Sequence, residues 1–433
     1  LMRFKTGTPA RVDARSLDFS QFELQPGDDD APHFSFMTDE TSPTLPQVSC
    51  WLAYTNETTH RILRENIQRA PMANGVIEGV GPRYCPSIET KILRFPDKER
   101  HQLFLEPEGL HTREIYVQGM STSMPMDVQI AFLRTIPGLT HCRIMRAGYA
   151  IEYDCIDPRQ LRPSLEFKAI RGFFSAGQAN GTSGYEEAAA QGLMAGINAA
   201  LQLAGKEPLI LKRSEAYIGV LIDDLVTKGT EEPYRMMTSR AEYRLLLRQD
   251  NADLRLTEHG RRVGLVTEER WARFTKKKTE IGAALAALKE TLLTPSREIN
   301  EKLKAAGLGE IRVVTSLFAL LRRPAADYGK LCALFPLPAI AKEAAREVDI
   351  AASYDGYIEK QQEDVRRQER LENRLLPEDM DYGQVPSLRD EAREKLAALR
   401  PRSVGQAGRI SGVSPADISL LLVWLERARR GHG

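Results

Sequence analysis

A single cysteine with basic neighbours is the most reactive side chain that the sequence offers. Cys85 lies in the stretch G-P-R-Y-C-P-S-I-E, two residues after Arg83, and Lys91 and Arg94 follow closely. Cationic neighbours lower the pKa of a thiol and favour the nucleophilic thiolate, so Cys85 is a candidate for covalent or acid–base chemistry. The alternative is a small, buried structural cysteine in a loop, which is the commoner role of a lone cysteine.

A second candidate site is a glycine-rich step into an alanine-rich helix. Residues 170–176 form a short apolar run that predicts a buried strand, and the helix is expected to begin near Tyr185. The turn between them carries Gly177, Gly181 and Gly184. Glycines let a ligand approach the main chain, and a helix N-terminus favours a phosphate. An ordinary helix with a Gly, Thr and Ser start is the alternative.

Two further stretches have features of anion-binding loops. K-T-G-T-P-A-R at residues 5–11 sets a turn between two cations, although a solvated loop is the alternative. G-V-G at residues 79–81 supplies half of a dinucleotide-binding fingerprint, but Tyr84 stands where the third glycine belongs. No complete G-x-G-x-x-G follows a predicted strand, so the sequence lacks the usual cradle for a dinucleotide pyrophosphate.

Arginines in the C-terminal half recur in patterns that suit contact with a nucleic acid. Arg240, Arg244 and Arg248 are spaced by four residues, which predicts one helical face for phosphate contact. Pairing with nearby acidic residues of the same chain is the alternative. The tail predicts two helices joined by a G-V-S-P turn with Ser414 as N-cap, and its arginines could follow an RNA backbone. These tail arginines are Arg402, Arg409, Arg427, Arg429 and Arg430.

Composition narrows the class of protein. The 433 residues suffice for two or three domains, and a net charge of +1 means that any nucleic-acid surface must be local. No apolar run approaches the roughly 18 residues of a membrane span, and the first residues do not resemble a signal peptide. Five scattered cysteines without a C-x-x-C pair predict neither a disulfide framework nor a metal site. We therefore expect a cytoplasmic protein.

The elements that must position these residues fall into two classes. Up to about residue 208 short strands alternate with turns, and beyond it amphipathic helices take over. The predicted strands are 51–55, 91–95, 102–105, 114–117 and 143–151, and the helices among them are 58–69 and 127–135. The later predicted helices are 214–225, 268–292, 316–323, 328–334 and 343–374. The sequence thus predicts an α/β region at 1–208, a helical domain at 209–347 and a helical subdomain at 348–433.

The glycine-rich stretch resembles a known family. G-Q-A-N-G-T-S-G-Y-E-E-A-A-A-Q-G at residues 177–192 is similar to the C-terminal flavin-contact segment of the MnmG family, also called glucose-inhibited division protein A. G-P-R-Y-C-P-S-I-E resembles the signature of that family, and K-T-G-T-P-x-R, the arginine-rich block and the helical C-terminal region are similar as well. The resemblance implies a partial FAD/NAD(P)-binding Rossmann-like α/β region with mixed strands, followed by an all-α C-terminal domain.

The resemblance also implies a function. Members of the family use FAD to place an aminomethyl or carboxymethylaminomethyl group on C5 of the wobble uridine of transfer RNA. It implies FAD and NADH as cofactors, methylenetetrahydrofolate as co-substrate, and the GTPase MnmE, transfer RNA and a second copy of the chain as partners. Two alternatives remain: a non-catalytic scaffold that binds RNA and partners, and a folate-dependent transfer RNA uridine methyltransferase. The long helical region argues against the methyltransferase.

The resemblance assigns roles to individual residues. Cys85 is expected to be catalytic. The expected cofactor contacts are Lys5, Thr8, Gly81, Arg83, Lys91, Gln178, Asn180, Gly181 and Gly184. The expected RNA contacts are Arg240, Arg244, Arg248, Arg409 and Arg427. The strand that ends in this region could also bring Tyr149, Glu152, Tyr153 and Asp154 beside the flavin, or be a plain strand. The N-terminal FAD fingerprint of the family and its other proposed catalytic cysteine are absent, so we expect a fragment or a form that binds FAD weakly.

Overall fold

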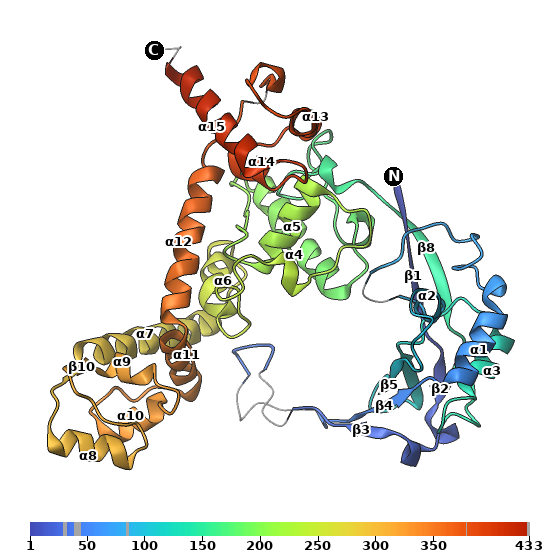
Figure 1. The fold of residues 1–433 in the computed structure, drawn as a ribbon, viewed down its shortest axis with the longest axis horizontal. Coiled ribbons are helices and arrows are strands. Elements are labelled where there is room, and N and C mark those ends of the chain that lie inside the picture. Colours follow the sequence, from blue (N-terminus) through green and yellow to red (C-terminus); the bar gives the residue numbers. More distant parts are fainter. Residues whose placement is uncertain (29–32, 39–44, 84–85, 378, 431–433) are drawn as a thin grey trace. The chain divides into compact units, whose positions relative to one another are not determined.

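A computed structural model describes residues 1–28, 33–38, 45–83, 86–377 and 379–430, with side chains through residue 427. The chain divides into two compact units (Figure 1). The first unit comprises Leu1–Gly196 and Gly229–Arg235, and the second comprises Ile197–Lys228 and Met236–Gly433. The boundary between them falls inside helix α4, which runs from Tyr185 to Leu203.

The first unit is built on a six-stranded sheet with the strand order β3-β4-β5-β6-β2-β7. Neighbouring strands pair antiparallel, so alternate residues of each strand face the same side. The strands are β2 (Arg11–Asp13), β3 (Glu23–Gln25), β4 (Cys50–Tyr54), β5 (Gln102–Pro107), β6 (Glu114–Gln118) and β7 (Ile144–Arg146).

Three helices share the core of this sheet. They are α1 (Glu57–Glu65), α2 (Ile88–Arg94) and α3 (Met126–Leu133). Leu63 of α1, Ile92 of α2 and Phe132 of α3 belong to one buried apolar cluster with Leu103 and Val117 of the sheet. Burial of such side chains away from water is the main term that stabilises this part of the unit.

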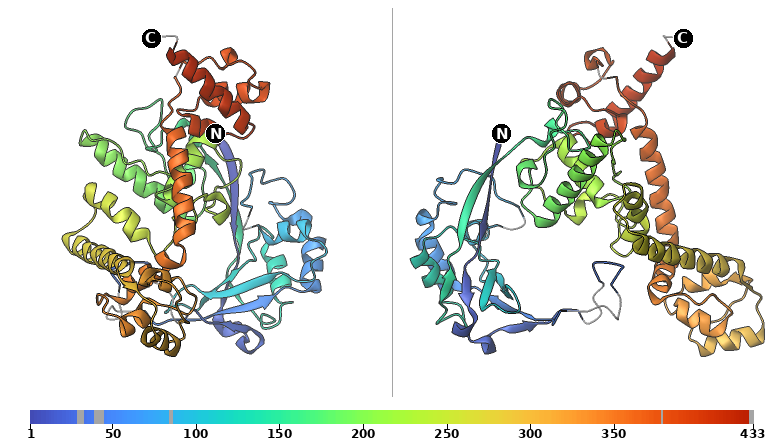
Figure 2. Two further views of the ribbon diagram at one scale, coloured as in Figure 1. Left: turned by 60° about the vertical axis from the view of Figure 1, so that its left-hand side comes forward. Right: turned by 180° about the vertical axis from the view of Figure 1, so that it is seen from behind.

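A separate two-stranded ribbon runs through the first unit. β1 (Met2–Thr8) pairs antiparallel with β8 (Tyr149–Cys155), in a register from Met2 opposite Cys155 to Thr8 opposite Tyr149. Both views in Figure 2 show this long ribbon, with β1 in dark blue. Ile156, directly after β8, donates its N–H to the carbonyl of Ala179, which joins the ribbon to the glycine-rich loop before α4.

The second unit is helical apart from the two-residue strands β9 (Leu292–Leu293) and β10 (Thr315–Ser316). One core gathers α7 (Glu268–Glu290), α8 (Arg297–Ala305), α9 (Leu317–Leu321), α10 (Tyr328–Leu334) and α11 (Lys342–Ser353). The other gathers α13 (Asp390–Leu399), α14 (Val404–Gly408) and α15 (Pro415–Arg430) with the segment after α12 (Asp355–Glu372). The remaining helices are α5 (Tyr217–Lys228) and α6 (Ala252–Arg262). No helix among the described residues is long and apolar enough to cross a membrane.

Many predicted elements are confirmed. The strands predicted at 51–55, 102–105 and 114–117 are β4, β5 and β6, and the helices predicted at 58–69 and 127–135 are α1 and α3. The helix predicted at 328–334 has the bounds of α10, and the one predicted at 268–292 is α7. The turn before α15 is capped as expected, since Ser414 Oγ accepts from the N–H of Asp417 and the Asp417 carboxylate accepts from the N–H of Ser414.

Two predicted strands are wrong. Residues 91–94 lie in helix α2 and Phe95 is its C-cap, because Ser87 caps the N-terminus of the helix and Ile88 and Ile92, four residues apart, are buried on one face. Residues 170–176 do not form a buried strand, since Ile170 and Phe173 are 54% and 52% exposed. The apolar side chains of this loop pack locally, as the stacked rings of Phe167 and Phe173 show.

Two helical predictions are also corrected. The four-residue spacing of Arg240, Arg244 and Arg248 does not lie on a helix: a short 3₁₀ turn covers Thr238–Arg240, and turns and bends follow up to α6. The long helix predicted at 343–374 is two helices, α11 and α12, which meet at Tyr354. At Tyr354 the main chain leaves helical geometry, with φ −107° and ψ 8°.

Candidate functional site

The loop that leads to Arg83 is fixed on the β1–β8 ribbon. Lys5 donates its N–H to the Val80 carbonyl, and Val80 donates to the Arg3 carbonyl, so residue 80 continues the ribbon beside β1 in a parallel bridge. Gly79 is needed here, because an added Cβ would lie 2.7 Å from the carbonyl carbon of Phe4. The Gly79 N–H donates to Glu152 Oε1 at 2.5 Å, which ties the loop to β8 as well.

The glycine-rich loop closes against the start of α4. Residues Gly177–Asn180 form a 3₁₀ turn, and Gly177 and Gly181 have φ angles of +72° and +87°, which side chains rarely adopt. Gly184 has an internal reason to be glycine, since an added Cβ would lie 1.8 Å from the carboxylate of Glu187. Glu187 in turn pairs with Arg235 at 3.1 Å.

Two buried amides lie beside this loop. Asn180 Nδ2 and the N–H of Gly177 both donate to Gln191 Oε1, at 2.8 and 3.2 Å. Asn180 Oδ1 and Gln191 Nε2 are buried and have no hydrogen-bond partner among the described residues. A buried polar atom without a partner costs about 1–3 kcal/mol, so such atoms are expected to pair with a ligand or water. Gln178 and Ala179 beside them are exposed.

These features fit a flavin nucleotide. The loop offers an unpaired acceptor and an unpaired donor beside two glycines with positive φ, next to the N-terminal end of a helix. The residues that would hold such a group are Gln178, Asn180, Gly181 and Gln191. The sequence does not predict Gln191 as a contact, because nothing in it distinguishes this residue from the others in the alanine-rich helix.

A segment far along the sequence joins the two loops. Tyr234 donates its N–H to the Gly181 carbonyl at 2.9 Å, and its own carbonyl accepts from Thr182 Oγ1 at 2.9 Å. Two residues earlier, Glu232 Oε1 lies 3.1 Å from Nη2 of Arg83. The structure therefore brings the Arg83 loop and the glycine-rich loop together through residues 229–235, and the sequence does not predict this.

Comparison with known proteins places this arrangement in a family. The family model "Glucose inhibited division protein A" matches residues 1–207. The models "tRNA modifying enzyme MnmG/GidA C-terminal helical domain" and "tRNA modifying enzyme MnmG/GidA C-terminal helical bundle" match residues 268–362 and 364–433. The "tRNA uridine 5-carboxymethylaminomethyl modification enzyme MnmG" of Clostridium kluyveri is 58% identical over 431 residues, which are 99% of this chain and 68% of the relative. The chain belongs to the MnmG/GidA family.

Other relatives agree with this assignment. The MnmG of Caldicellulosiruptor saccharolyticus is 57% identical over 432 residues, which are 100% of this chain and 69% of that relative. The solved structure of Aquifex aeolicus GidA in its form II crystal superposes with a TM-score of 0.84 at 46% identity, and the match covers 98% of this chain and 67% of that one. The resemblance found in the sequence is thus confirmed, as is the predicted order of an α/β region followed by a helical one.

Not every expected cofactor contact of the MnmG/GidA family lies near the glycine-rich loop. Lys5 lies beside Gly81, where an added Cβ would lie 3.5 Å from the Lys5 side chain. Lys5 Nζ donates to the Met72 carbonyl. Thr8 is at the other end of β1, where its hydroxyl accepts from Arg11. Lys91 donates from α2 to the Gly119 carbonyl at 2.7 Å. Thr8 and Lys91 therefore contact other parts of the first unit.

Cys85, the expected catalytic residue, lies outside the described residues, and the described cysteines have features of structural thiols. Burial raises the pKa of Cys155 to about 11, and burial also raises the pKa values of Cys50, Cys142 and Cys332. A raised pKa disfavours the thiolate. Among the described residues no group of His, Cys, Asp and Glu side chains could hold a metal ion, either.

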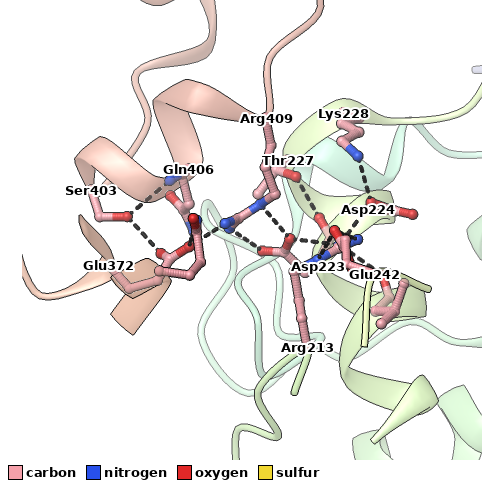
Figure 3. A network of polar contacts seen from close by, with 12 residues as sticks. Arg213, Asp223, Asp224, Thr227, Lys228, Glu242, Glu372, Ser403, Gln406 and Arg409 are labelled. Carbon is pink, nitrogen blue, oxygen red and sulfur yellow. Dashed lines mark hydrogen bonds and ion pairs between the residues drawn. The ribbon is translucent and has the colours of Figure 1, made fainter. Parts of the chain in front are cut away.

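One expected RNA contact is buried in a polar network (Figure 3). Arg409, the C-cap residue of α14, reaches Asp223 of α5 with two nitrogens, Nε at 3.0 Å and Nη2 at 3.1 Å, and also pairs with Glu372 of α12. Its side chain is only 12% exposed. Although burial alone would lower the pKa of Arg409, its acidic partners raise that pKa. This arginine connects three helices of the second unit.

A second buried arginine completes the network. Arg213 contacts Asp223 at 2.9 Å, Asp224 at 2.8 Å and Glu242 at 2.6 Å. Burial would lower the pKa of Arg213, but Asp224 and Asp223 raise it. Asp223 thus lies between two guanidinium groups, and the network in Figure 3 holds three cationic and four anionic side chains.

The other expected RNA contacts differ in exposure. Arg248 is half-buried and pairs with Asp250 at 3.0 Å, as the pairing alternative predicts. Arg240 is also half-buried, whereas Arg244 and Arg427 are exposed. Arg244 and Arg427 therefore present charge on the surface of the second unit.

Proposed function

We propose that the chain acts in the modification that names its relatives, the 5-carboxymethylaminomethyl modification of a uridine in transfer RNA. The single observation that carries the proposal is the pair of unpaired, buried amide atoms beside the glycine-rich loop, within a chain that matches MnmG proteins at 56–58% identity. We further propose that FAD binds at this loop. When bound, FAD supplies redox chemistry for a folate-derived one-carbon unit.

The chain's own residues would have distinct tasks. Gln178, Asn180, Gly181 and Gln191 would bind and orient the flavin, with Asn180 Oδ1 accepting one hydrogen bond and Gln191 Nε2 donating one. Arg83 would hold an anionic group of a nucleotide, because its side chain is 63% exposed and a guanidinium has several donors. Cys85 would act as a nucleophile or as an acid–base group toward the uridine.

The finer assignments of the proposal follow from the family. NADH would be the electron donor and methylenetetrahydrofolate the co-substrate. The target would be C5 of the wobble uridine, with an aminomethyl or carboxymethylaminomethyl product formed together with MnmE. The protein would act in the cytoplasm as a homodimer, and Arg244 and Arg427 would contact the RNA backbone. Two other RNA candidates, Arg409 and Arg248, pair instead with acidic side chains of the same unit.

The test combines a binding and a product readout. The protein is incubated with FAD, NADH, methylenetetrahydrofolate, MnmE and transfer RNA, and nucleosides from the RNA are analysed by mass spectrometry. We expect a C5-modified uridine with the wild type and none with Cys85→Ala, while both proteins show the visible absorbance of bound flavin. A colourless protein that still shifts transfer RNA in a gel would instead support a non-catalytic RNA-binding scaffold.

A further inference from the structure

The segment Gly229–Arg235 contacts the glycine-rich loop through its main chain. Tyr234, which is 1% exposed, forms a parallel bridge with Thr182, and its carbonyl accepts a hydrogen bond from the Thr182 hydroxyl. Arg235 pairs with the buried carboxylate of Glu187 in the first turn of α4. The segment therefore has a fixed position relative to the loop that would hold the flavin.

The same segment contacts the Arg83 loop through one side chain. Glu232 Oε1 lies 3.1 Å from Nη2 of Arg83, and the two side chains are 21% and 63% exposed. An ion pair that is this open to water contributes little to stability. Its effect is on geometry, because it restricts the orientations that a long arginine side chain can adopt.

The segment before Arg83 is held at residues 79 and 80. The N–H and the carbonyl of Val80 both form hydrogen bonds with the main chain of β1, and the N–H of Gly79 donates to Glu152. The ion pair with Glu232 adds an anchor at residue 83 and also restricts the direction of the Arg83 guanidinium. Because Glu232 is paired at one nitrogen, Nη2, the other donors of the guanidinium stay available for a ligand.

We propose that Glu232 is a positioning residue that orients Arg83 toward a phosphate group of a bound nucleotide. The segment Gly229–Arg235 then sets the placement of this arginine relative to the glycine-rich loop. A guanidinium suits a phosphate because it offers charge-assisted hydrogen bonds in a planar fork. The phosphate could belong to a nicotinamide dinucleotide or to the transfer RNA backbone. The inference rests on the proposed function only for the identity of that ligand.

The experiment compares Glu232→Gln with Glu231→Gln in the full protein. Glu231 is the exposed neighbour in the same segment, so its variant loses the same charge without the contact to Arg83. Hydrogen exchange is followed for peptides that cover residues 75–83, and thermal unfolding shows that each variant is folded. We expect faster exchange in these peptides for Glu232→Gln and wild-type exchange for Glu231→Gln.

Ligand binding is measured with two probes. The KM for NADH is determined from reduction of the bound flavin in the absence of RNA, and the Kd for transfer RNA is determined in the absence of NADH. We expect Glu232→Gln to raise one of the two by about fivefold, the change that a partly exposed ion pair supports. The probe that responds identifies the source of the phosphate.

A double-mutant cycle separates positioning from a general structural effect. In an Arg83→Met background, Glu232→Gln should have no further effect on the responsive constant, because Glu232 acts through Arg83. Unchanged exchange at residues 75–83 in Glu232→Gln, or effects of the two substitutions that simply add, would overturn the inference. Hydrogen exchange can be measured in a protein that has no activity. If the wild type neither reduces flavin nor modifies RNA, the proposed function is refuted, and hydrogen exchange still decides whether Glu232 positions Arg83.

Discussion

Replacing Arg409 by methionine tests whether this arginine is a structural tie or an RNA contact. Methionine keeps much of the length of the side chain but removes the charge that faces Asp223 and Glu372. Removing one partner of a buried ion pair typically costs about 3–5 kcal/mol. Asp223 would keep Arg213 at 2.9 Å, so we expect the lower end, about 3 kcal/mol.

Thermal unfolding and RNA titrations measure the two possible roles. For a domain of roughly 200 residues each kcal/mol lowers Tm by about 2–4 °C, so the Arg409→Met variant should unfold at a clearly lower temperature. Below that temperature its affinity for transfer RNA and the salt dependence of that affinity should match the wild type. Arg244→Met is the matched control, since Arg244 is exposed: it should keep the wild-type Tm and lower the salt slope by about 1.

The opposite pattern would refute this reasoning. If Arg409→Met kept the wild-type Tm and weakened RNA binding with a reduced salt slope, Arg409 would be a phosphate contact and the network in Figure 3 would contribute little to stability. Asp223→Asn provides a second perturbation of the same network. It should destabilise the second unit as well, because both Arg213 and Arg409 lose their shared carboxylate.

Three further predictions concern other parts of the chain. Burial and Asp250 raise the pKa of Glu347 to about 7 from 4.5, so the stability that its proton contributes is lost as the pH rises through about 7. At pH 8 the free energy of unfolding of Glu347→Gln, measured by chemical denaturation, should exceed that of the wild type by up to about 3 kcal/mol, and this difference should vanish below pH 4.5. Asn180→Ala should weaken FAD binding, measured by flavin fluorescence, by about tenfold or more, which corresponds to about 1.4 kcal/mol. The control is Asn198→Ala, which removes a buried amide bonded to Leu209 and should lower Tm while the affinity for FAD stays unchanged. Gly79→Ala should release the Arg83 loop from β1, because its Cβ would lie 2.7 Å from the main chain of Phe4, and limited proteolysis between residues 70 and 83 should then become faster.

Local patterns predicted those elements whose signals lie within a few residues. The short strand-like runs at 102–105 and 114–117 mark β5 and β6, and the Ser-Pro turn marks the start of α15. The run at 91–95 misled because its apolar residues fit a strand as well as a helix, and Ser87 decides between them as a cap. The arginines at 240–248 misled because a four-residue spacing has meaning only on a helix, and the chain forms a 3₁₀ turn followed by turns and bends there.

The candidate site shows which contacts cannot be predicted from a single sequence. Its glycines and Arg83 could be named in advance, since turn geometry and charge are local properties. The contacts that assemble the site join residues far apart: Gly79 and Glu152 are separated by 73 positions, and Thr182 and Tyr234 by 52. No spacing rule connects such pairs, because their separation is set by the intervening fold.

These long-range contacts also explain why the glycine-rich loop should not be judged as a motif alone. Gly184 is required by the carboxylate of Glu187, and that carboxylate is required by Arg235, so part of the glycine pattern serves the internal packing of α4. Gly181, by contrast, adopts a left-handed conformation beside the unpaired amide oxygen of Asn180. Substituting alanine at each position separates the two requirements: Gly184→Ala should lower Tm together with FAD affinity, since it displaces the helix start. A variant that restores room for the alanine, Gly184→Ala with Glu187→Gly, should recover flavin binding more than stability, because the Arg235 ion pair remains lost. Recovery of neither would mean that Gly184 itself faces the ligand.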